Sequence, residues 1–205
     1  MKKHIQLGIF LMLTTGFLSF AGSEKTIENL KSAYNGEYNV SIKYAAYADQ
    51  ARKEGLTNIA IMFSATSKAE AIHAENHKKV LSRMGQTVIP IKPAVTVKKT
   101  TENLQDAISG ETDEMTSIYP RFIATAKSES AMDAVKSFRW AMETEKKHNI
   151  IYQNALNALK NNKPNDVPKV YWVCPKCGNT YDVSKPETTC SFCGTKSASY
   201  VRFDK

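Results

Sequence analysis

Long uncharged apolar segments are scarce in this chain of 205 residues. The longest apolar run, from Leu7 to Phe20, falls short of the roughly 20 residues that span a bilayer. Cysteine is also scarce, and all four cysteines lie within residues 174–193. No cysteine stands directly after the apolar run, where a lipid anchor would be attached. Lysine and arginine are in excess, giving a net charge of +8, but they form pairs rather than a stripe interleaved with aromatic residues. We therefore expect no stable membrane anchor and no nucleic-acid partner.

The N-terminus has the pattern of a secretory signal peptide. Residues 1–4 are basic, an apolar run follows, and Ser19 and Ala21 are small residues at the two positions that a signal peptidase reads. We expect residues 1–21 to be removed and the protein to be exported to the periplasm. Because no twin arginine is present, the chain should be exported unfolded and loaded with metal afterwards. The alternatives are a weakly hydrophobic N-terminal tail or an uncleaved anchor, and a cytoplasmic location in place of export.

Four segments carry the apolar spacing of amphipathic helices, over residues 24–53, 57–84, 100–122 and 130–159. Residues 86–100 contain Pro90 and Pro93 and do not read as helix. They are long enough to run the length of a bundle before the third helix begins. Pro120 falls inside the third segment and should kink it. We predict a mainly α fold, with a four-helix bundle over residues 22–160 and a long crossover between its second and third helices.

Hydroxyl side chains mark where two of these helices should begin. Ser23 or Thr26 is positioned to cap the first helix, and Thr100 or Thr101 the third. Their oxygens would accept hydrogen bonds from N–H groups of the first turn, which have no partner within the helix.

Glutamates and histidines interrupt the stripes that should face the core of the bundle. Glu145 and His148 are three residues apart and so share a helix face, and Glu70 and His73 repeat this spacing. A carboxylate on a buried apolar stripe is costly unless a cation or hydrogen bonds compensate. The candidate ligands on the four stripes are Glu37, Glu70, His73, Glu111, Glu114, Glu145 and His148. Two Glu-x-x-His motifs with glutamates from the other two helices are the pattern of ferritin-like di-iron proteins, and this donor set favours iron or manganese.

Three further polar residues lie close to these positions in the helices. Tyr44 and Tyr119 are one or two turns from candidate ligands. Each is either an aromatic core residue whose hydroxyl needs a partner or a hydrogen-bond donor to oxygen bound at the metals. His77, one turn beyond His73, is expected to support the ligands or to fill the core rather than to bind metal.

The cysteines form two Cys-x-x-Cys-Gly units after a polar linker. The linker, residues 161–169, is rich in Asn, Lys and Pro, and residues 170–205 are strand-prone and too few to fold on an apolar core alone. The glycine after each pair permits a tight backbone turn. Residues 178–189 separate the two units, a spacing typical of a tetrahedral metal site formed by Cys174, Cys177, Cys190 and Cys193. Iron would make this site a one-electron redox centre, whereas zinc would make it structural.

Taken together, these motifs resemble the rubrerythrin family over residues 24–205. The resemblance rests on Glu37 in Tyr-Asn-Gly-Glu, the two Glu-x-x-His motifs, Gly-Glu-Thr-Asp-Glu at residues 110–114 followed by Tyr119, and the rubredoxin-like cysteine spacing. It implies two non-haem iron ions in a ferritin-like bundle and one iron ion in a rubredoxin-like domain.

The resemblance also implies a role for each ligand. Glu70 and Glu145 match bridging carboxylates. The terminal ligands match Glu37, Glu111 and His148. One iron is expected to move between His73 in the reduced state and Glu114 in the oxidised state.

The implied activity is that of a peroxidase that reduces hydrogen peroxide to water and protects against oxidative stress. The rubredoxin-like iron would return electrons one at a time from a donor protein or reductase. Family members form homodimers in which the Cys₄ site of one chain serves the bundle of the other. Most members are cytoplasmic, so the signal-like leader departs from the pattern, and the usual route from NADH would not reach an exported enzyme. The alternatives are a ferritin-type ferroxidase and a bundle with a structural zinc ribbon.

Overall fold

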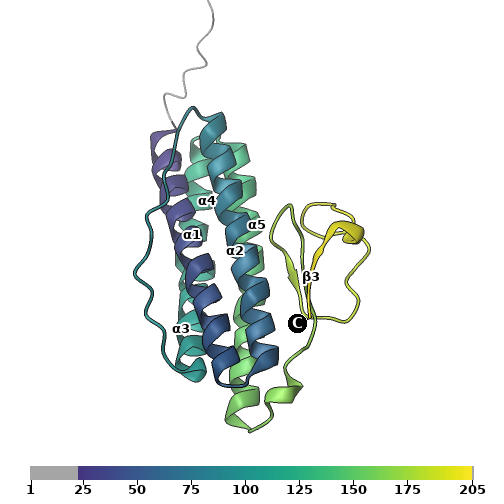
Figure 1. The fold of residues 1–205 in the computed structure, drawn as a ribbon. Helices are drawn as coiled ribbons and strands as arrows, with labels where there is room; N and C mark the ends of the chain where they lie inside the picture. The colour runs from purple at the N-terminus through teal and green to yellow at the C-terminus, as the bar shows by residue number, and fades with distance from the viewer. Residues whose placement is uncertain (1–22, 205) are drawn as a thin grey trace, which may run out of the picture.

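The structure, a computed structural model, describes residues 23–204 (Figure 1), and the predicted signal peptide lies outside them. The helices are α1 Glu24–Lys53, α2 Thr57–Arg83, α3 Thr100–Asp113, the π turn η1 Glu114–Ile118, α4 Tyr119–Ser128 and α5 Met132–Lys160. Two 3₁₀ turns follow, η2 Pro164–Asp166 and η3 Ser197–Ser199, with the strands β1 Tyr171–Val173, β2 Thr180–Tyr181 and β3 Val201–Phe203. No helix within residues 23–204 is long and apolar enough to cross a membrane.

The helices pack as a four-helix bundle in which α3 and α4 together form one of the four rods (Figure 1). α1 and α2 are an antiparallel pair that turns at Gly55, whose φ of +74° suits a glycine. Residues 86–99 then run back along the bundle, so α3 starts beside the end of α1. There the N–H of Thr100 donates to the Glu54 carboxylate at 3.1 Å. The predicted mainly α, ferritin-like bundle with a long crossover is confirmed.

The first turns of α1 and α3 are capped from a distance rather than by local hydroxyls. Ser23 makes no side-chain cap bond, and Lys99 rather than a threonine precedes α3. The Glu129 carboxylate, from the end of α4, accepts the N–H of Thr26 at 2.8 Å, much as Glu54 serves α3. The predicted hydroxyl caps are therefore wrong. Charged carboxylates from neighbouring helix ends supply stronger acceptors, and the sequence around each start does not reveal them.

The third rod changes its winding in front of Pro120. α3 passes into the π turn at Glu114, and α4 begins at Tyr119. Proline has no N–H, and its ring crowds the carbonyl four residues earlier, so regular α pairing cannot continue through it. The disturbance predicted at Pro120 takes the form of this wider turn, which occurs frequently at functional sites. It separates Glu111 from Tyr119, two residues whose side chains both reach the centre of the bundle.

A layer of polar residues divides the apolar core of the bundle into two clusters. One cluster includes Phe63 and Tyr152, and the other includes Leu81 and Phe138, all of them fully buried. Along each rod the candidate ligands fall between members of the two clusters; Glu145, for example, follows Phe138 and precedes Tyr152. The two clusters thus shield the polar layer from water on both sides.

The C-terminal module is a small antiparallel sheet with the strand order β2–β1–β3. Trp172 in β1 pairs with Tyr181 in β2 on one side and with Arg202 in β3 on the other. Its buried cluster consists largely of cysteines and tyrosines rather than aliphatic side chains. Such a core is small, as expected for a module that depends on a bound ion.

The module packs against α2 and α5 of its own chain (Figure 1). The side-chain amide of Asn76 donates to the Lys176 carbonyl at 2.9 Å. The indole N–H of Trp140 donates to the Phe192 carbonyl at 3.2 Å. The structure therefore makes within one chain a contact that the family resemblance implied between two chains.

Candidate metal centres

Six of the seven candidate bundle ligands meet at the centre of the bundle, and all six are buried. They form two overlapping groups, and the donor atoms within each group lie within 4.8 Å of one another. The first group is Glu37, Glu70, His73 and Glu145, and the second is Glu70, Glu111, Glu145 and His148. Because Glu70 and Glu145 belong to both groups, the arrangement fits two metal ions that share these carboxylates.

Glu70 and Glu145 each reach from one histidine to the other. The two oxygens of Glu70 lie 2.9 Å from Nδ1 of His73 and 2.9 Å from Nδ1 of His148. The oxygens of Glu145 lie 3.0 Å from the same two nitrogens. Donors placed about 2.1 Å from a shared ion and at right angles are about 3 Å apart. These spacings support the bridging roles implied for the two glutamates, which stay a prediction.

Burial opposes ionisation of the carboxyl groups at the bundle centre. Burial, followed by neighbouring carboxylates, raises the pKa of Glu37, Glu111 and Glu145 well above the usual range. Burial acts on Glu70 as well, but the two histidines outweigh it and lower its pKa to about 2. Oε2 of Glu37 and of Glu111 is buried without a hydrogen-bond partner in the described part of the chain. Two divalent cations would balance this charge and use these lone pairs, so the donors fit a di-metal centre.

Glu114 is the candidate ligand that the structure does not bring into either group. It is the first residue of the π turn and is half-buried. Burial and then the charge of Glu70 raise the pKa of Glu114 to about 8. The alternation of an ion between His73 and Glu114 remains a prediction.

Tyr44 and Tyr119 donate hydrogen bonds to carboxylates of the cluster. The hydroxyl of Tyr44 lies 2.6 Å from Oε1 of Glu111, and that of Tyr119 donates to Oε1 of Glu37. Burial and the neighbouring glutamates raise the pKa of both tyrosines. Both phenols therefore stay protonated and fix the orientation of a carboxylate at each end of the cluster.

Thr180 of the C-terminal module contacts a candidate ligand and was missed by sequence reasoning. Its Oγ1 donates to the Gly178 carbonyl at 3.0 Å and lies 2.9 Å from Nε2 of His148. Since a hydroxyl has one proton to donate, Thr180 accepts from Nε2–H. In the neutral imidazole the lone pair of His148 is then on Nδ1, beside the carboxylates, where a bound ion would use it. Nothing in the cysteine spacing indicates which helix the module touches, so no sequence signal pointed to this residue.

Gly178 lies directly against His73, the other histidine among the candidate ligands. Its φ is +81°, and a Cβ at this position would lie 2.3 Å from Nε2 of His73. Gly194, after the second cysteine pair, has a φ of +74° but open space around a Cβ. Both glycines permit the expected turn. Gly178 has a second role, because only a residue without a side chain lets the module approach His73.

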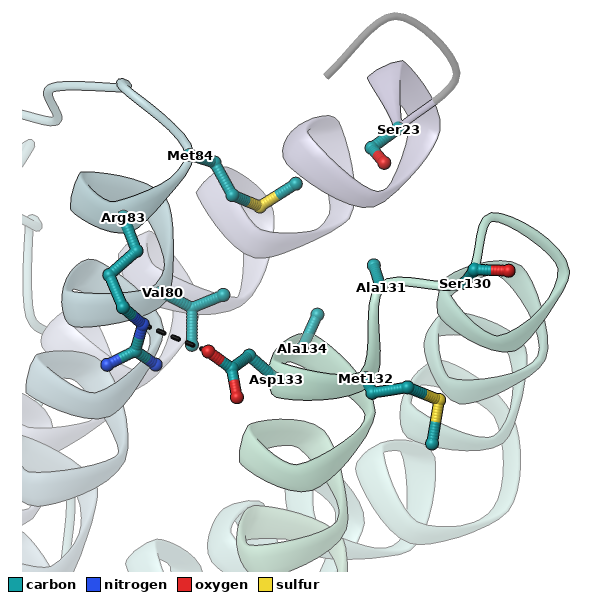
Figure 2. Close-up of a pocket in the computed structure, with 9 residues that line it drawn as sticks. All are labelled: Ser23, Val80, Arg83, Met84, Ser130, Ala131, Met132, Asp133 and Ala134. Carbon is teal, nitrogen blue, oxygen red and sulfur yellow. Dashed lines mark ion pairs between the residues drawn. The ribbon is translucent and has the colours of Figure 1, made fainter. Parts of the chain in front are cut away.

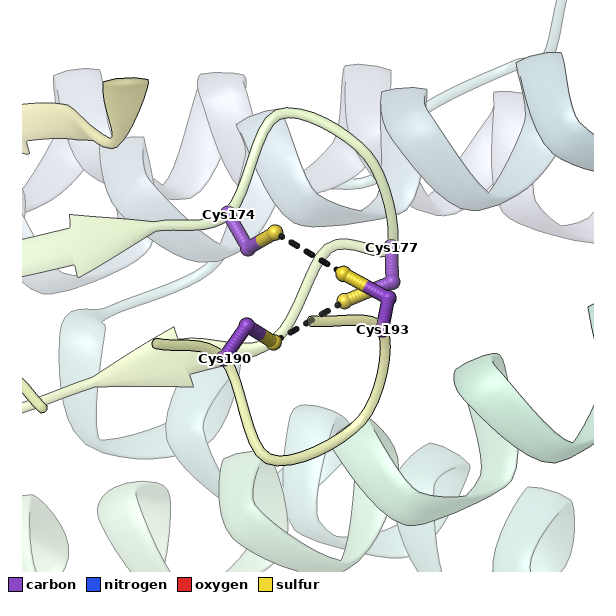
Figure 3. Close-up of side chains that lie close together, drawn as sticks. All are labelled: Cys174, Cys177, Cys190 and Cys193. Carbon is purple, nitrogen blue, oxygen red and sulfur yellow. Dashed lines mark hydrogen bonds between the residues drawn. The ribbon is translucent and has the colours of Figure 1, made fainter. Parts of the chain in front are cut away.

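The four cysteine sulfurs converge between two loops of the module (Figure 3). Sulfur atoms lie 3.5 Å apart in the pairs Cys174–Cys193 and Cys177–Cys190. A disulfide bond would need about 2.05 Å. A tetrahedral ion about 2.3 Å from each sulfur would place the sulfurs about 3.8 Å apart. The donors therefore fit one ion, and iron and zinc meet the same geometry.

A surface pocket at the end of the bundle where α1 begins is separate from both centres (Figure 2). It has a volume of about 260 Å³ and is lined by residues such as Val80, Met84 and Ala134, with none of the candidate ligands. Arg83 and Asp133 form an ion pair of 3.0 Å at its edge. The pocket therefore does not contact the candidate ligands at the bundle centre.

The fold and the two donor sets define a ferritin-like di-metal bundle with an attached Cys₄ module. The chain belongs to the rubrerythrin family, which it matches over residues 28–156. It is 32% identical over 179 residues to rubrerythrin-2 of Clostridium acetobutylicum, covering 87% of this chain and 96% of that protein. It is 34% identical over 154 residues to nigerythrin of Nitratidesulfovibrio vulgaris, covering 75% and 74%. The solved structure of fully reduced, all-ferrous nigerythrin matches with a TM-score of 0.78 at 30% identity, covering 87% and 86%.

Proposed function

We propose that this protein is a non-haem di-iron peroxidase that reduces hydrogen peroxide to water. The main support is the contact between the two centres. His73 lies against Gly178, which directly follows the candidate ligand Cys177, and His148 bonds to Thr180, three residues after that cysteine. A Cys₄ module that could hold a one-electron redox ion, and that contacts both candidate ligand histidines, suits a redox reaction at the bundle centre. A bundle that only oxidised or stored iron would have no use for it.

Peroxide reduction consumes two electrons and two protons: H₂O₂ + 2 H⁺ + 2 e⁻ → 2 H₂O. Iron bound at the two centres would supply the electrons, two from the bundle and their replacements through the Cys₄ site from a donor protein or reductase. The six converging carboxylate and imidazole side chains would hold the bundle ions, and the two apolar clusters exclude water from around them.

Tyr44 and Tyr119 hold protons beside the place where peroxide would be cleaved. Each hydroxyl donates to a carboxylate of the cluster, Glu111 and Glu37 respectively. Because burial raises the pKa of both phenols, they keep their protons at neutral pH. On turning from its carboxylate toward the substrate, either hydroxyl would donate a hydrogen bond to a peroxide oxygen as the O–O bond breaks.

The test is to mix the anaerobically reduced, iron-loaded protein with hydrogen peroxide or with dioxygen in a stopped-flow instrument. The proposal predicts that peroxide oxidises the protein much faster than dioxygen does. Faster oxidation by dioxygen, with more than three irons bound per chain, would instead identify a ferroxidase. A protein with iron at all three positions that ignores peroxide would end the proposal.

Rubrerythrins typically form homodimers, and we propose this assembly here as well. Mixing chains that carry Cys177→Ser with chains that carry Glu145→Ala tests which bundle each module serves. The contact within one chain predicts no recovery of peroxidase activity in the mixture. Recovery would show that the module serves the bundle of the partner chain.

A further inference from the structure

His77 on α2 is a fully buried histidine that belongs to neither group of donors. Its ring packs beside Phe138, with 5.3 Å between the ring centroids. Both ring nitrogens have polar partners on other helices: Nδ1 lies 2.9 Å from Oγ of Ser137 on α5, and Nε2 lies 3.2 Å from the hydroxyl of Tyr119 on α4. Tyr119 in turn donates to Glu37. A hydrogen-bonded chain thus runs from α5 to a candidate ligand.

The direction of every hydrogen bond in this chain follows from the number of protons available. Tyr119 gives its one proton to Glu37, so its oxygen must accept from Nε2–H of His77. A neutral imidazole with Nε2–H has a lone pair on Nδ1, so Ser137 must donate to it. All three donors therefore point toward the carboxylate cluster, the orientation needed to deliver a proton inward.

The outer end of the chain opens to a surface groove. Ser137 is 5% exposed and lines a groove of about 570 Å³ between the bundle and the C-terminal module. Lys79, Lys136 and Lys176 also line it, so the groove carries charged side chains and is accessible to water. The Arg83–Asp133 ion pair of Figure 2 borders both this groove and the pocket at the bundle end.

We propose that Ser137, His77 and Tyr119 form a proton path from this groove to Glu37 at the bundle centre. A hydronium ion in the groove gives a proton to Oγ of Ser137 and becomes water, as the Ser137 proton passes to Nδ1 of His77. The Nε2 proton of His77 moves to the Tyr119 oxygen, and the Tyr119 proton moves to Oε1 of Glu37. One proton enters and one is delivered, with no change of charge on the path. The relay leaves His77 with its proton on Nδ1, so the path is reset when the imidazole returns to the Nε2–H tautomer and the hydroxyls rotate back.

This role rests on the proposed function, because each peroxide reduced requires two protons at a centre that apolar clusters shield from water. His77 acts through Tyr119 and is a positioning residue rather than a catalytic one. The same geometry explains why a polar side chain is tolerated inside the apolar cluster around Phe138: both of its nitrogens are satisfied.

The first test needs no turnover. In protein loaded with zinc at the bundle centre and labelled with ¹⁵N-histidine, NMR reports which nitrogen of His77 carries the proton and how fast that proton exchanges with water. The path predicts Nε2–H, and predicts that Ser137→Ala slows its exchange by about 10²-fold. Ser67→Ala is the matched control, because it removes a hydrogen bond from a half-buried serine to the Ser41 carbonyl, away from the path. A proton on Nδ1, or equal exchange in Ser137→Ala and Ser67→Ala, would overturn the proposal.

The second test follows proton uptake with a pH indicator during a single reaction of the reduced, iron-loaded protein with peroxide. His77→Gln, which keeps hydrogen-bonding groups but cannot relay a proton by exchanging tautomers, should slow uptake by about 10-fold to 10²-fold with unchanged metal content. Added imidazole should restore the rate in His77→Gly. Uptake at the wild-type rate in His77→Gln would refute the path. If wild-type protein ignored peroxide while the exchange result held, the peroxidase proposal would fail and the path would stand.

Discussion

The two metal centres of this protein are built in opposite ways. The bundle centre gathers side chains from position 37 to position 148 on separate helices, between two apolar clusters that pack without any ion. The Cys₄ site is assembled from residues 174–193 in a module whose core is largely the cysteines themselves. The packing of the helices therefore determines the geometry of the bundle ligands. In the module, binding of an ion by the cysteines is expected to stabilise the fold itself.

Removing one cysteine should produce the largest effect. Cys177→Ser should release the ion of the Cys₄ site and unfold residues 171–203, because a structural ion of this kind contributes about 10–16 kcal/mol of binding free energy. Metal analysis and amide hydrogen exchange measure both losses. The helices should keep their protection and their own ions. A bundle that unfolds along with the module would contradict the difference between the two regions.

Removing a shared carboxylate should empty the bundle without unfolding it. Glu145 belongs to both donor groups, so Glu145→Ala should lose both bundle ions while the Cys₄ site stays filled. Metal analysis per chain is the measurement. Glu143→Ala is the control on the same helix, because Glu143 is exposed and pairs only with Lys146, at 2.7 Å. Retention of two bundle ions in Glu145→Ala would show that Glu145 is not shared between them.

The stability of the metal-free bundle should fall as pH rises from 6.5 to 8. Burial raises the pKa of Glu114 to about 8, and the pKa of Glu37, Glu111 and Glu145 is raised as well, so the folded state holds protons that the unfolded state has released. Stability from such groups is complete below their unfolded pKa, near 4.5, and is lost as pH approaches the folded pKa. We expect a loss of at least about 2 kcal/mol in denaturant unfolding.

The range from pH 6.5 to 8 is chosen because His77 affects the pH dependence of stability, with the opposite sign, mainly below pH 6.5. Burial lowers the pKa of His77 to about 3, so it is neutral in both states above its ordinary value of 6.5. Metal-loaded protein is the control and should show little loss over the same range, because bound cations keep the carboxylates ionised. An equal dependence of stability on pH in the metal-free and the metal-loaded protein would contradict the view that bound cations keep the carboxylates ionised.

A single methyl group at the contact between the two regions should produce the smallest change in stability. Gly178→Ala would place a Cβ 2.3 Å from Nε2 of His73 and should displace the module from α2. Gly194→Ala introduces similar backbone strain, at a φ of +74°, with nothing within 4 Å of the new Cβ. Backbone strain should cost each variant about 1 kcal/mol in the module, and Gly178→Ala should in addition weaken the packing of the module on α2. Only Gly178→Ala should also slow reoxidation of the Cys₄ site by peroxide, by about tenfold or more. Equal reoxidation rates in the two variants would show that the contact between Gly178 and His73 does not contribute to electron transfer.

Much of the bundle could be predicted from sequence because its signals are local and periodic. The helix ends near Lys53 and Lys160 and the non-helical crossover follow from apolar spacing, glycine and proline. The inward position of Glu70 with His73 follows from helix geometry alone, since three residues separate them.

The remaining features depend on residues that are distant in sequence. Glu129 caps α1 and Glu54 caps α3, although neither residue lies directly before the helix that it caps. The sequence therefore predicted caps from the local hydroxyl residues instead. Thr180 and Gly178 reach the ligand histidines only because the module packs on α2 and α5. The hydrogen bonds of His77 join three helices, and no spacing within α2 reveals them.

The most direct test of the coupling between the two centres is the visible spectrum of the iron-loaded protein through one cycle of reduction and peroxide addition. Iron at the four cysteines absorbs in the visible range when oxidised. Our account predicts that this absorption bleaches on reduction and returns when one equivalent of hydrogen peroxide is added, in wild type and far more slowly in Gly178→Ala. A colourless protein with zinc at the cysteines, or an iron centre that stays bleached after peroxide, would contradict it.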